Sequence, residues 1–265
     1  MIGTISLNSG INSSLSSLKE ISKASAQSQQ RLATGKSVNA VTDDPINFFK
    51  AVSNLQAADD LNSFKDTMSE SIKTMQAANN GVEAISKLAD MAKGIASSAL
   101  LTSDPAQRSQ MAQSYNTVIS QMNQIAKDSG YRGTDLLTGD SLSVQTGKQS
   151  TLEVTGFDGT GGAQPAAGNW GSNGEIEASM SQMETSVSNI RTNTASMQSQ
   201  SSTIATIQSF TESMANTLKT GADNLTLADM NEEAANTLMS NTRQQLATSA
   251  LGMASQSANS ILKVF

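Results

Sequence analysis

Two adjacent acids, Asp43 and Asp44, are the residues whose types and spacing best suit chemistry. A carboxylate pair can act as general acid and base, or can bind a divalent cation. No His, Cys or third acid lies near them in the sequence. Asp44 precedes Pro45, and this order is typical of a helix start, where the carboxylate accepts hydrogen bonds from unpaired amides. Asp43 adds negative charge near the same helix end. Helix capping is therefore favoured over a catalytic or metal-binding pair.

The composition removes most other routes to catalysis. The chain has no Cys and no His, so it lacks disulfides, thiolate nucleophiles, the commonest metal ligand and the usual general base. Serine is abundant, but without His or a placed Lys it has no activating base, and Lys148 lies in a predicted solvated turn. The sequence GTGG at 159–162 lacks the helix and Lys of a phosphate loop. We therefore predict no enzyme, no cofactor and no catalytic or metal-binding residues.

Charge and hydropathy argue against nucleic acid and membrane partners. The net charge is −6 and no basic cluster is present. The first residues, MIGTISLNSG, have neither the basic nor the apolar segment of a signal peptide, and no apolar run approaches about 18 residues. Only 15% of residues are charged, while Ser, Thr, Asn and Gln are plentiful. Such a surface suits dense packing against other protein chains, because burying neutral polar groups costs less than burying charges.

The elements that would position any site are organised around one long heptad stripe. Its positions follow a strict four-three spacing and no Pro or Gly interrupts them, which predicts a single helix lying along partners of similar length. The stripe consists of Ile176, Met180, Met183, Val187, Ile190, Thr194, Met197, Ser201, Ile204, Gln208, Thr211, Ala215 and Leu218. The polar positions within it should face small or polar residues in a seam that is not maximally tight.

The first half of the chain is predicted to form three helices. The first contains Ile11, Leu15 and Leu18, runs to Leu32 and ends at Gly35. The first ten residues have too few apolar side chains to keep a fixed position without a partner. The second runs from Pro45 to about Leu100, with bends expected at 79–81 and Gly94. The third opens at Asp104 and Pro105, ends at Gly130, and places on one face Tyr115, Val118, Met122 and Ile125.

A different pattern follows these helices. Apolar residues alternate at 142–146 and at 152–154 around a turn at 147–150, which predicts a β-hairpin. The segment Asp158–Gly174 holds six Gly, one Pro and the lone Trp170, and we expect an exposed loop or a reduced surface module.

The C-terminal helix is predicted to begin at a cap formed by Thr226 or Asp229, after the long helix ends near 219–221. Small and apolar residues lie on one of its sides and allow close helix approach: Ala247, Ala250, Leu251, Ala254, Ala258, Ile261, Leu262 and Phe265. Because weak, small-residue helices lie at both chain ends, we infer that the ends pair with each other and with neighbouring molecules. The fold class is thus mainly α, an elongated antiparallel helical bundle or coiled coil with a small β-hairpin.

Four segments resemble bacterial flagellin. RLATGKSVNAVTDDPINFFKA at Arg31–Ala51 is similar to the family's link between the terminal helix and the long core helix, and Gly221–Phe265, with ADMNEE and TRQQLA, is similar to its C-terminus. Ala77–Ala96 resembles a core helix and Tyr131–Gly139 the loop before the hairpin. The resemblance implies terminal helices that form an inner tube, a helical core with a hairpin, and a variable outer region reduced here to Asp158–Gly174.

The resemblance implies five segments with different roles. Residues 1–44 and 222–265 would be polymerisation segments that order on assembly, residues 45–140 the N-terminal core helices, 141–174 the hairpin and variable loop, and 175–221 the C-terminal core helix. The implied function is the structural subunit of the extracellular flagellar filament, with further copies of the chain, cap and junction proteins, an export chaperone and the type III export apparatus as partners.

Three other readings of the sequence remain open. A hook–filament junction protein shares the terminal helices, and would be present in sheared filaments only in trace amounts. An adhesin could use the loop around Trp170, and a hydrolase or metal-dependent enzyme would show activity sensitive to serine reagents or chelators. The position where many enterobacterial relatives carry an acidic residue read by an innate immune receptor is Thr117 here, which argues against recognition by that receptor.

Overall fold

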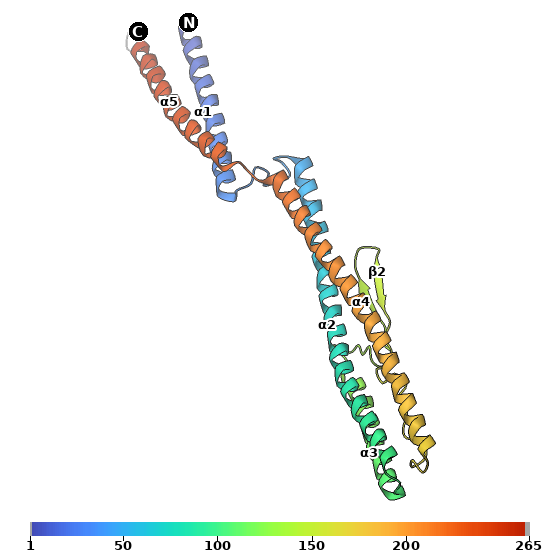
Figure 1. Cartoon of the computed structure of the whole chain (residues 1–265). Coiled ribbons are helices and arrows are strands. Elements are labelled where there is room, and N and C mark those ends of the chain that lie inside the picture. The colour runs from blue at the N-terminus through green and yellow to red at the C-terminus, as the bar shows by residue number, and fades with distance from the viewer. Residues whose placement is uncertain (1, 263–265) are drawn as a thin grey trace. The chain divides into compact units, whose positions relative to one another are not determined.

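The structure is a computed structural model that describes the backbone of residues 2–262 and the side chains of residues 12–256. Five helices and one two-stranded sheet follow each other along the chain (Figure 1), namely α1 Ile2–Thr34, α2 Pro45–Leu101, α3 Pro105–Asp128, β1 Leu142–Gln145, β2 Thr151–Val154, α4 Asn173–Thr226 and α5 Met230–Leu262. The mainly α fold with a small hairpin is therefore confirmed. The chain divides into two compact units: unit 1 comprises Met1–Ala57 and Thr217–Phe265, and unit 2 comprises Ala58–Asn216.

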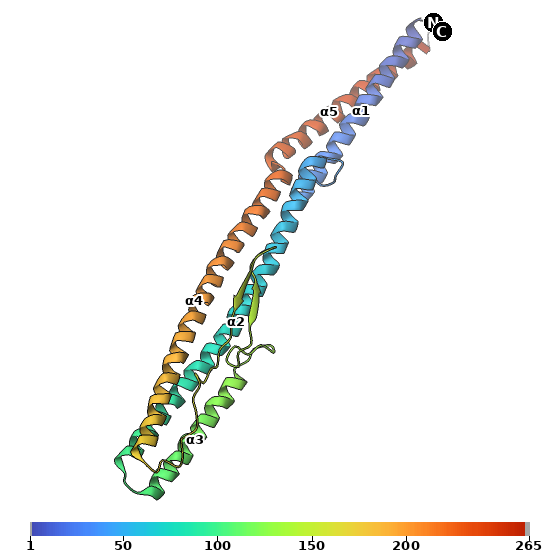
Figure 2. The ribbon, with the colours of Figure 1, turned by 90° about the vertical axis from the view of Figure 1, so that its right-hand side faces the viewer.

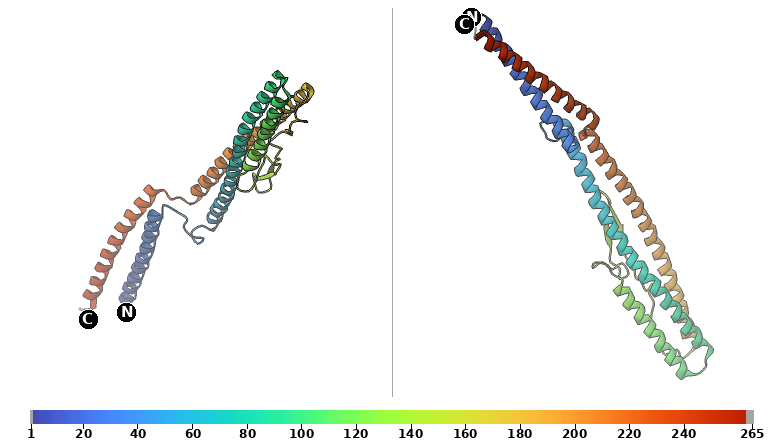
Figure 3. Two further views of the ribbon diagram at one scale, coloured as in Figure 1. Left: turned by 90° about the horizontal axis from the view of Figure 1, so that it is seen from below. Right: turned by 90° about the vertical axis from the view of Figure 1, so that its left-hand side faces the viewer.

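Unit 1 is built around the pair formed by α1 and α5. The two helices lie side by side and antiparallel, so the beginning of α1 and the end of α5 lie at the same end of the pair (Figure 3). The predicted pairing of the two chain ends is thus confirmed. Helix α1 already begins at Ile2, whereas the sequence indicates that the first ten residues would be loose. Extending a formed helix adds a hydrogen bond for each residue fixed, which explains the longer element.

Unit 2 is built on the antiparallel contact between α2 and α4 (Figure 2). Four polar contacts connect the helices: Lys65 with Glu212, Gln208 with Ser69, Gln198 with Asn79, and Lys93 with Glu184. From one contact to the next, the advance along α2 equals the retreat along α4. One antiparallel register therefore holds across the whole of unit 2, as expected for a coiled-coil seam.

The heptad stripe of α4 faces this seam. None of its thirteen positions is exposed, and Ile176, Met183, Ile190 and Ile204 are fully buried. The polar positions are covered as predicted, since Thr211 is buried and Gln208 donates a hydrogen bond of 2.6 Å to the hydroxyl of Ser69. The hydroxyl of Thr194 is buried without a hydrogen-bond partner among the described residues. The seam is thus held together by apolar contacts that are interrupted at regular intervals.

Helix α3 and the hairpin complete the core of unit 2. The carboxylate of Asp104 accepts a hydrogen bond of 2.9 Å from the amide of Ala106, which confirms the predicted cap. The predicted Tyr115, Val118 and Met122 are buried, and the predicted Ile125 is partly buried against the same core. The other buried residues of α3 are Ala112, Ile119 and Ala126. In the hairpin, Leu142 pairs with Val154 and Val144 with Leu152, as the alternation predicts. The buried Val144 and Val154 belong to the same core as the helices.

The prediction of an exposed loop at Asp158–Gly174 is wrong for Trp170, which is buried. Trp170 is 0% exposed, its ring centroid lies 5.2 Å from that of Tyr115, and its indole N–H donates a hydrogen bond of 3.0 Å to the hydroxyl of Ser179. A large aromatic residue with a partner for its N–H gains more from burial than the glycine-rich segment loses by being ordered. Because Trp170 belongs to the core, the loop does not offer it as an adhesive side chain.

Helix α2 is a single element through both positions of the expected bends, and the end of α4 differs from the prediction. Helix α2 continues through 79–81 and Gly94 without a break. A Cβ atom at Gly81 would meet the side chains of Ser129 and Leu137, so this glycine allows these residues to approach the helix closely. Helix α4 runs to Thr226, beyond the predicted end near 219–221, because a glycine within a helix costs only about 1 kcal/mol.

Candidate functional site

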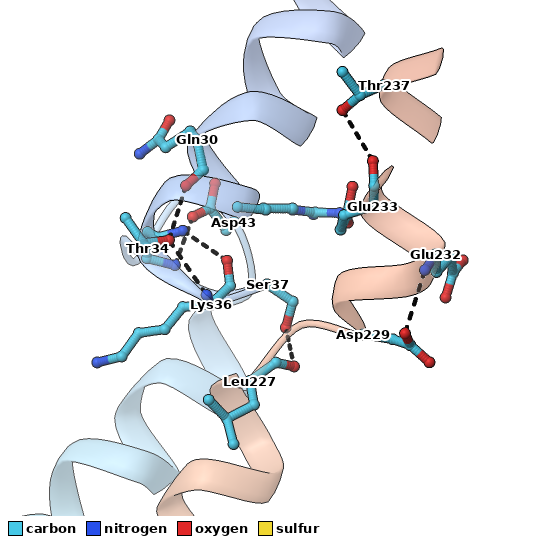
Figure 4. A network of polar contacts seen from close by, with 12 residues as sticks. Gln30, Thr34, Lys36, Ser37, Asp43, Leu227, Asp229, Glu232, Glu233 and Thr237 are labelled. Carbon is cyan, nitrogen blue, oxygen red and sulfur yellow. Dashed lines mark hydrogen bonds and ion pairs between the residues drawn. The ribbon is translucent and has the colours of Figure 1, made fainter. Parts of the chain in front are cut away.

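The connection between α1 and α2 and the connection between α4 and α5 are hydrogen-bonded to each other (Figure 4). Gly35, with φ of +70°, ends α1 and donates its amide hydrogen bond back to the carbonyl of Arg31 at 2.8 Å. The carbonyl of Gly35 accepts a hydrogen bond from the amide of Ala228, and the amide and hydroxyl of Ser37 both donate to the carbonyl of Thr226. The hydroxyl of Ser37 also lies 3.1 Å from the carbonyl oxygen of Leu227 (Figure 4). The segment after α1 is thus fixed against the segment before α5.

The candidate carboxylate pair has a structural role in these connections. Asp44 caps α2 by accepting a hydrogen bond of 3.0 Å from the amide of Asn47. Asp43 faces the other way and accepts hydrogen bonds from the amides of Asn39 and Ala40, which lowers the pKa of its carboxyl group below its ordinary value. Both carboxylates are therefore occupied by backbone amides. The cap of α5 is Asp229, which accepts from the amide of Asn231, while Thr226 belongs to α4.

An ion pair joins the end of α1 to the start of α5. The guanidinium of Arg31 donates a hydrogen bond of 2.8 Å to the carboxylate of Glu233, whose side chain is 7% exposed. This hydrogen bond lowers the pKa of Glu233 below its ordinary value, and a smaller contribution comes from the hydroxyl of Ser28. A buried carboxylate requires such partners, because an unpaired charge away from water is strongly unfavourable. The pair therefore fixes the relative position of α1 and α5.

The facing rows of α1 and α5 consist mainly of small and polar side chains. Within each helix the less exposed residues follow a four-three spacing, which marks the face turned to the partner helix. On α1 these residues are Ser14, Leu18, Ile21, Ser25 and Ser28; on α5 they are Glu233, Thr237, Ser240, Gln244, Ala247, Leu251 and Ala254. Small residues at a seam let two helices approach closely, but they bury little apolar area.

Four large apolar residues of α5 lie on the opposite side and are exposed. Met239, Leu246 and Met253 are spaced seven residues apart, so they form one row along the helix, and Leu238 is adjacent to it. Leu246 and Met253 are each 66% exposed. We call these four residues the outer stripe. An uncovered apolar row of this kind marks an interaction surface, because its burial in a partner would be favourable by about 25 cal/mol per Å².

Unit 1 exposes further large apolar residues. Leu15 lies on α1, Ile46 and Phe49 lie in the first turns of α2, and Leu227 and Met230 flank the cap of α5. The ring of Phe49 contacts that of Phe48 edge to face, with centroids 5.8 Å apart. An open groove beside Leu15 is lined by Leu18, Ala26 and Gln244, with Lys19 and Lys23 among its polar residues. Unit 1 therefore has apolar surface suited to protein contacts on several elements.

The side of α5 that the sequence marks for close helix approach is the side that faces α1. The predicted residues Ala247, Leu251 and Ala254 do face α1, but Ala250 is exposed; the side chains of Ala258, Ile261, Leu262 and Phe265 lie outside the described residues. The outer stripe was missed, although the seven-residue spacing of Met239, Leu246 and Met253 was a usable signal. The ion pair of Arg31 with Glu233 had no sequence signal, since the two residues are far apart in the chain.

No other kind of site was found in the described part of the chain. Among residues 12–256, no group of three or more His, Cys, Asp or Glu side chains is arranged to hold a metal ion. No helix between residues 2 and 262 combines the length and the apolar character needed to cross a membrane.

Comparison with known proteins places these features in one family. The sequence model of the bacterial flagellin N-terminal helical region matches residues 5–141, more than half of the chain. Flagellin FljM and flagellin FljO of Caulobacter vibrioides are each 24% identical to this chain over 277 aligned residues, covering 100% of this chain and 99% of the relative. The crystal structure of Bacillus cereus flagellin matches with a TM-score of 0.49 and 14% identity, over 55% of this chain and 88% of that chain.

The match to the family model extends from α1 to the loop before β1, and the two relatives match over the whole length of the chain. Flagellins are structural proteins that polymerise into the flagellar filament. The exposed apolar surface of unit 1 agrees with a subunit that packs against copies of itself. This chain belongs to the bacterial flagellin family and is a structural subunit of the flagellar filament.

Proposed function

We propose that residues 1–44 and 222–265 are the polymerisation segments of this subunit, and that the outer stripe of α5 is a contact between copies. The observation that carries this proposal is the arrangement of α5, which turns mainly small and polar residues, with Leu251 as the one large apolar residue, toward α1 and the outer stripe toward solvent. An isolated helix pair would be more stable with the opposite arrangement. The exposed row is therefore understood as a surface whose partner is another subunit.

The contacts between copies are head-to-tail in this proposal. The outer stripe of one subunit faces a different surface of the next, so the interface does not close and an open helical fibre results. Residues 1–35 and 229–265 become fully ordered in that step, and their loss of conformational entropy is offset by burial of the exposed apolar residues. Polymerisation, rather than catalysis, is then the whole biochemical activity of the chain.

Other partners follow from the same surface. Each end of an open fibre leaves one face uncovered, which the cap protein at the distal end and the junction protein at the proximal end would cover. Before assembly the outer stripe would need a chaperone to prevent premature association. The chain has no cysteine, so no disulfide hinders its transport as an unfolded chain through the type III export apparatus to an extracellular filament.

The decisive experiment removes the surface while retaining the core. Chains lacking residues 1–35 or 229–265 should not form fibres after seeding with short filaments, as judged by electron microscopy, while the single Trp170 keeps the fluorescence of a folded unit 2. Normal filaments from either truncated chain would overturn the proposal.

A point variant tests the outer stripe itself. Leu246→Asp should prevent fibre growth, because an unpaired carboxylate in an apolar contact is strongly unfavourable. Leu101→Asp is the matched control, because Leu101 is a 90% exposed leucine in unit 2 outside the proposed segments. Equal loss of growth in both variants would show that the outer stripe has no special role.

A further inference from the structure

The sulfur atoms of this chain are distributed unevenly between core and surface. The chain has thirteen Met and no Cys, so the thioether is its only oxidisable sulfur group. Five methionines are buried in unit 2: Met68, Met75, Met122, Met183 and Met197. Five others are exposed: Met91, Met214, Met230, Met239 and Met253. Solvent oxidants reach the second group and are kept from the first by the core.

Two of the exposed thioethers belong to the outer stripe. Met239 is 45% exposed and Met253 is 66% exposed, and Leu246 lies midway between them on the same row of α5. Since this row has no covering element in unit 1, both sulfur atoms belong to the part of α5 that is open to solvent before assembly. No other chemically reactive group is present in the stripe, which otherwise contains two leucines.

We propose that Met239 and Met253 form an oxidation site at which a hydroperoxide blocks addition of the subunit to a fibre. In this step the thioether sulfur attacks one peroxide oxygen, the O–O bond breaks, and an S–O bond forms. The sulfur loses two electrons to the peroxide, whose second oxygen takes up the transferred proton and leaves as water from hydrogen peroxide or as an alcohol from an organic hydroperoxide. The product is methionine sulfoxide, which a dithiol can reduce back to the thioether through a sulfoxide reductase.

The sulfoxide acts on the same contact that polymerisation uses, so this inference rests on the proposed role of the outer stripe. Oxidation converts a flexible apolar side chain into a polar one with a strong hydrogen-bond acceptor. Burying that acceptor without a donor is unfavourable, and one such group raises the threshold concentration for assembly by about tenfold. Assembled fibres should resist the same oxidant at these two residues, because the stripe is then covered.

The experiment compares two double variants of the full-length chain. Met239→Leu/Met253→Leu keeps the size and apolar character of the stripe but removes its sulfur. Met91→Leu/Met214→Leu is the matched control, since it removes two exposed methionines from unit 2. Each chain is treated with hydrogen peroxide as a monomer, the sulfoxides are mapped by peptide mass spectrometry, and seeded fibre growth is measured.

The wild-type chain and the unit 2 variant should both lose growth after treatment, with a threshold at least about tenfold higher, and a sulfoxide reductase with dithiol should restore it. The stripe variant should keep its growth. If treated wild-type chains grow normally, or if the stripe variant is inhibited as strongly as the control, the proposal is overturned. A failure of untreated wild-type chains to polymerise would instead contradict the proposed function, so the two failures are distinguishable.

Discussion

A single buried charge, Glu233, links the two terminal helices. It is the one charged residue among the described side chains, residues 12–256, that is buried. Its carboxylate lies 2.8 Å from the guanidinium of Arg31, which is less buried and remains in contact with water. The ion pair therefore has a clear consequence for how α1 and α5 respond to acid.

We predict that the contact between α1 and α5 weakens when the pH falls below about 4.5, the ordinary pKa of a glutamate. Because Arg31 lowers the pKa of Glu233, the stabilisation is fully present above that ordinary value and is lost as the pH falls through the lowered pKa. Hydrogen exchange of α1 and α5 amides, corrected for the intrinsic rate, should show about tenfold lower protection. Glu233→Gln should remove this pH dependence, and an unchanged dependence in the variant would assign it to another group.

The unpaired hydroxyl of Thr194 should also have a measurable cost. Thr194→Val replaces a buried hydroxyl that has no partner by a methyl group of similar size, and should raise the free energy of unfolding of unit 2 by about 1 kcal/mol. Urea unfolding followed by the fluorescence of Trp170 measures this change. Thr206→Val is the control, because Thr206 is exposed and its hydroxyl donates to the carbonyl of Ser202. A destabilised Thr194→Val variant would show that the hydroxyl has a hydrogen-bond partner in solution.

At the scale of elements, two glycines within α2 have opposite expected effects. Gly81→Ala should destabilise unit 2 by about 1–3 kcal/mol, because the new methyl group would collide with Ser129 and Leu137. Gly94→Ala should stabilise it by about 0.5–1 kcal/mol, because no atom lies within 4 Å of the added carbon and the helix gains a better former. Urea unfolding of the two variants provides the comparison. Equal effects would mean that the close packing at Gly81 relaxes freely.

The elements that were predictable are those with a strict local pattern. The α4 stripe has a four-three spacing, Asp104 precedes a proline, and the hairpin alternates, so each of these features is set by neighbours in the sequence. The burial of Trp170 was not predictable, because it depends on Tyr115 and Ser179 from two other elements. The continuity of α2 through Gly81 depends likewise on the residues that pack against it.

At the scale of the whole molecule, low charge and exposed apolar surface should determine how assembly responds to salt. Only 15% of residues are charged, so screening by salt should change the interactions between subunits only slightly. Ammonium sulfate should lower the threshold concentration for fibre growth much more than sodium chloride of equal ionic strength, because sulfate strengthens the burial of apolar surface. Light scattering of seeded samples measures the threshold. An equal effect of both salts would indicate that electrostatic repulsion, rather than apolar burial, limits assembly.

The candidate site was predictable in location but not in detail. Both chain ends were identified from their small-residue helices and from resemblance to flagellins. The small-residue side of α5 that faces α1 was identified as well, but the outer stripe was not, because large apolar side chains are expected to be covered within their own chain. In a filament subunit the surroundings include other copies of the chain. We therefore expect Leu238, Met239, Leu246 and Met253 to be covered by a neighbouring subunit, although they are exposed in the single chain.

The polar contacts between α2 and α4 have a consequence for folding fidelity. A strict heptad stripe repeats every seven residues, so sliding α4 by two turns along α2 would bring another set of apolar residues into the same positions. The contacts of Gln208 with Ser69 and of Gln198 with Asn79 do not repeat in this way. A slip of seven residues would place Glu212 opposite Ala58 or Ile72 instead of Lys65, and the present hydrogen bonds of both glutamines would be broken. The imperfections of the seam therefore distinguish one alignment from its periodic alternatives, which an ideal apolar repeat could not do.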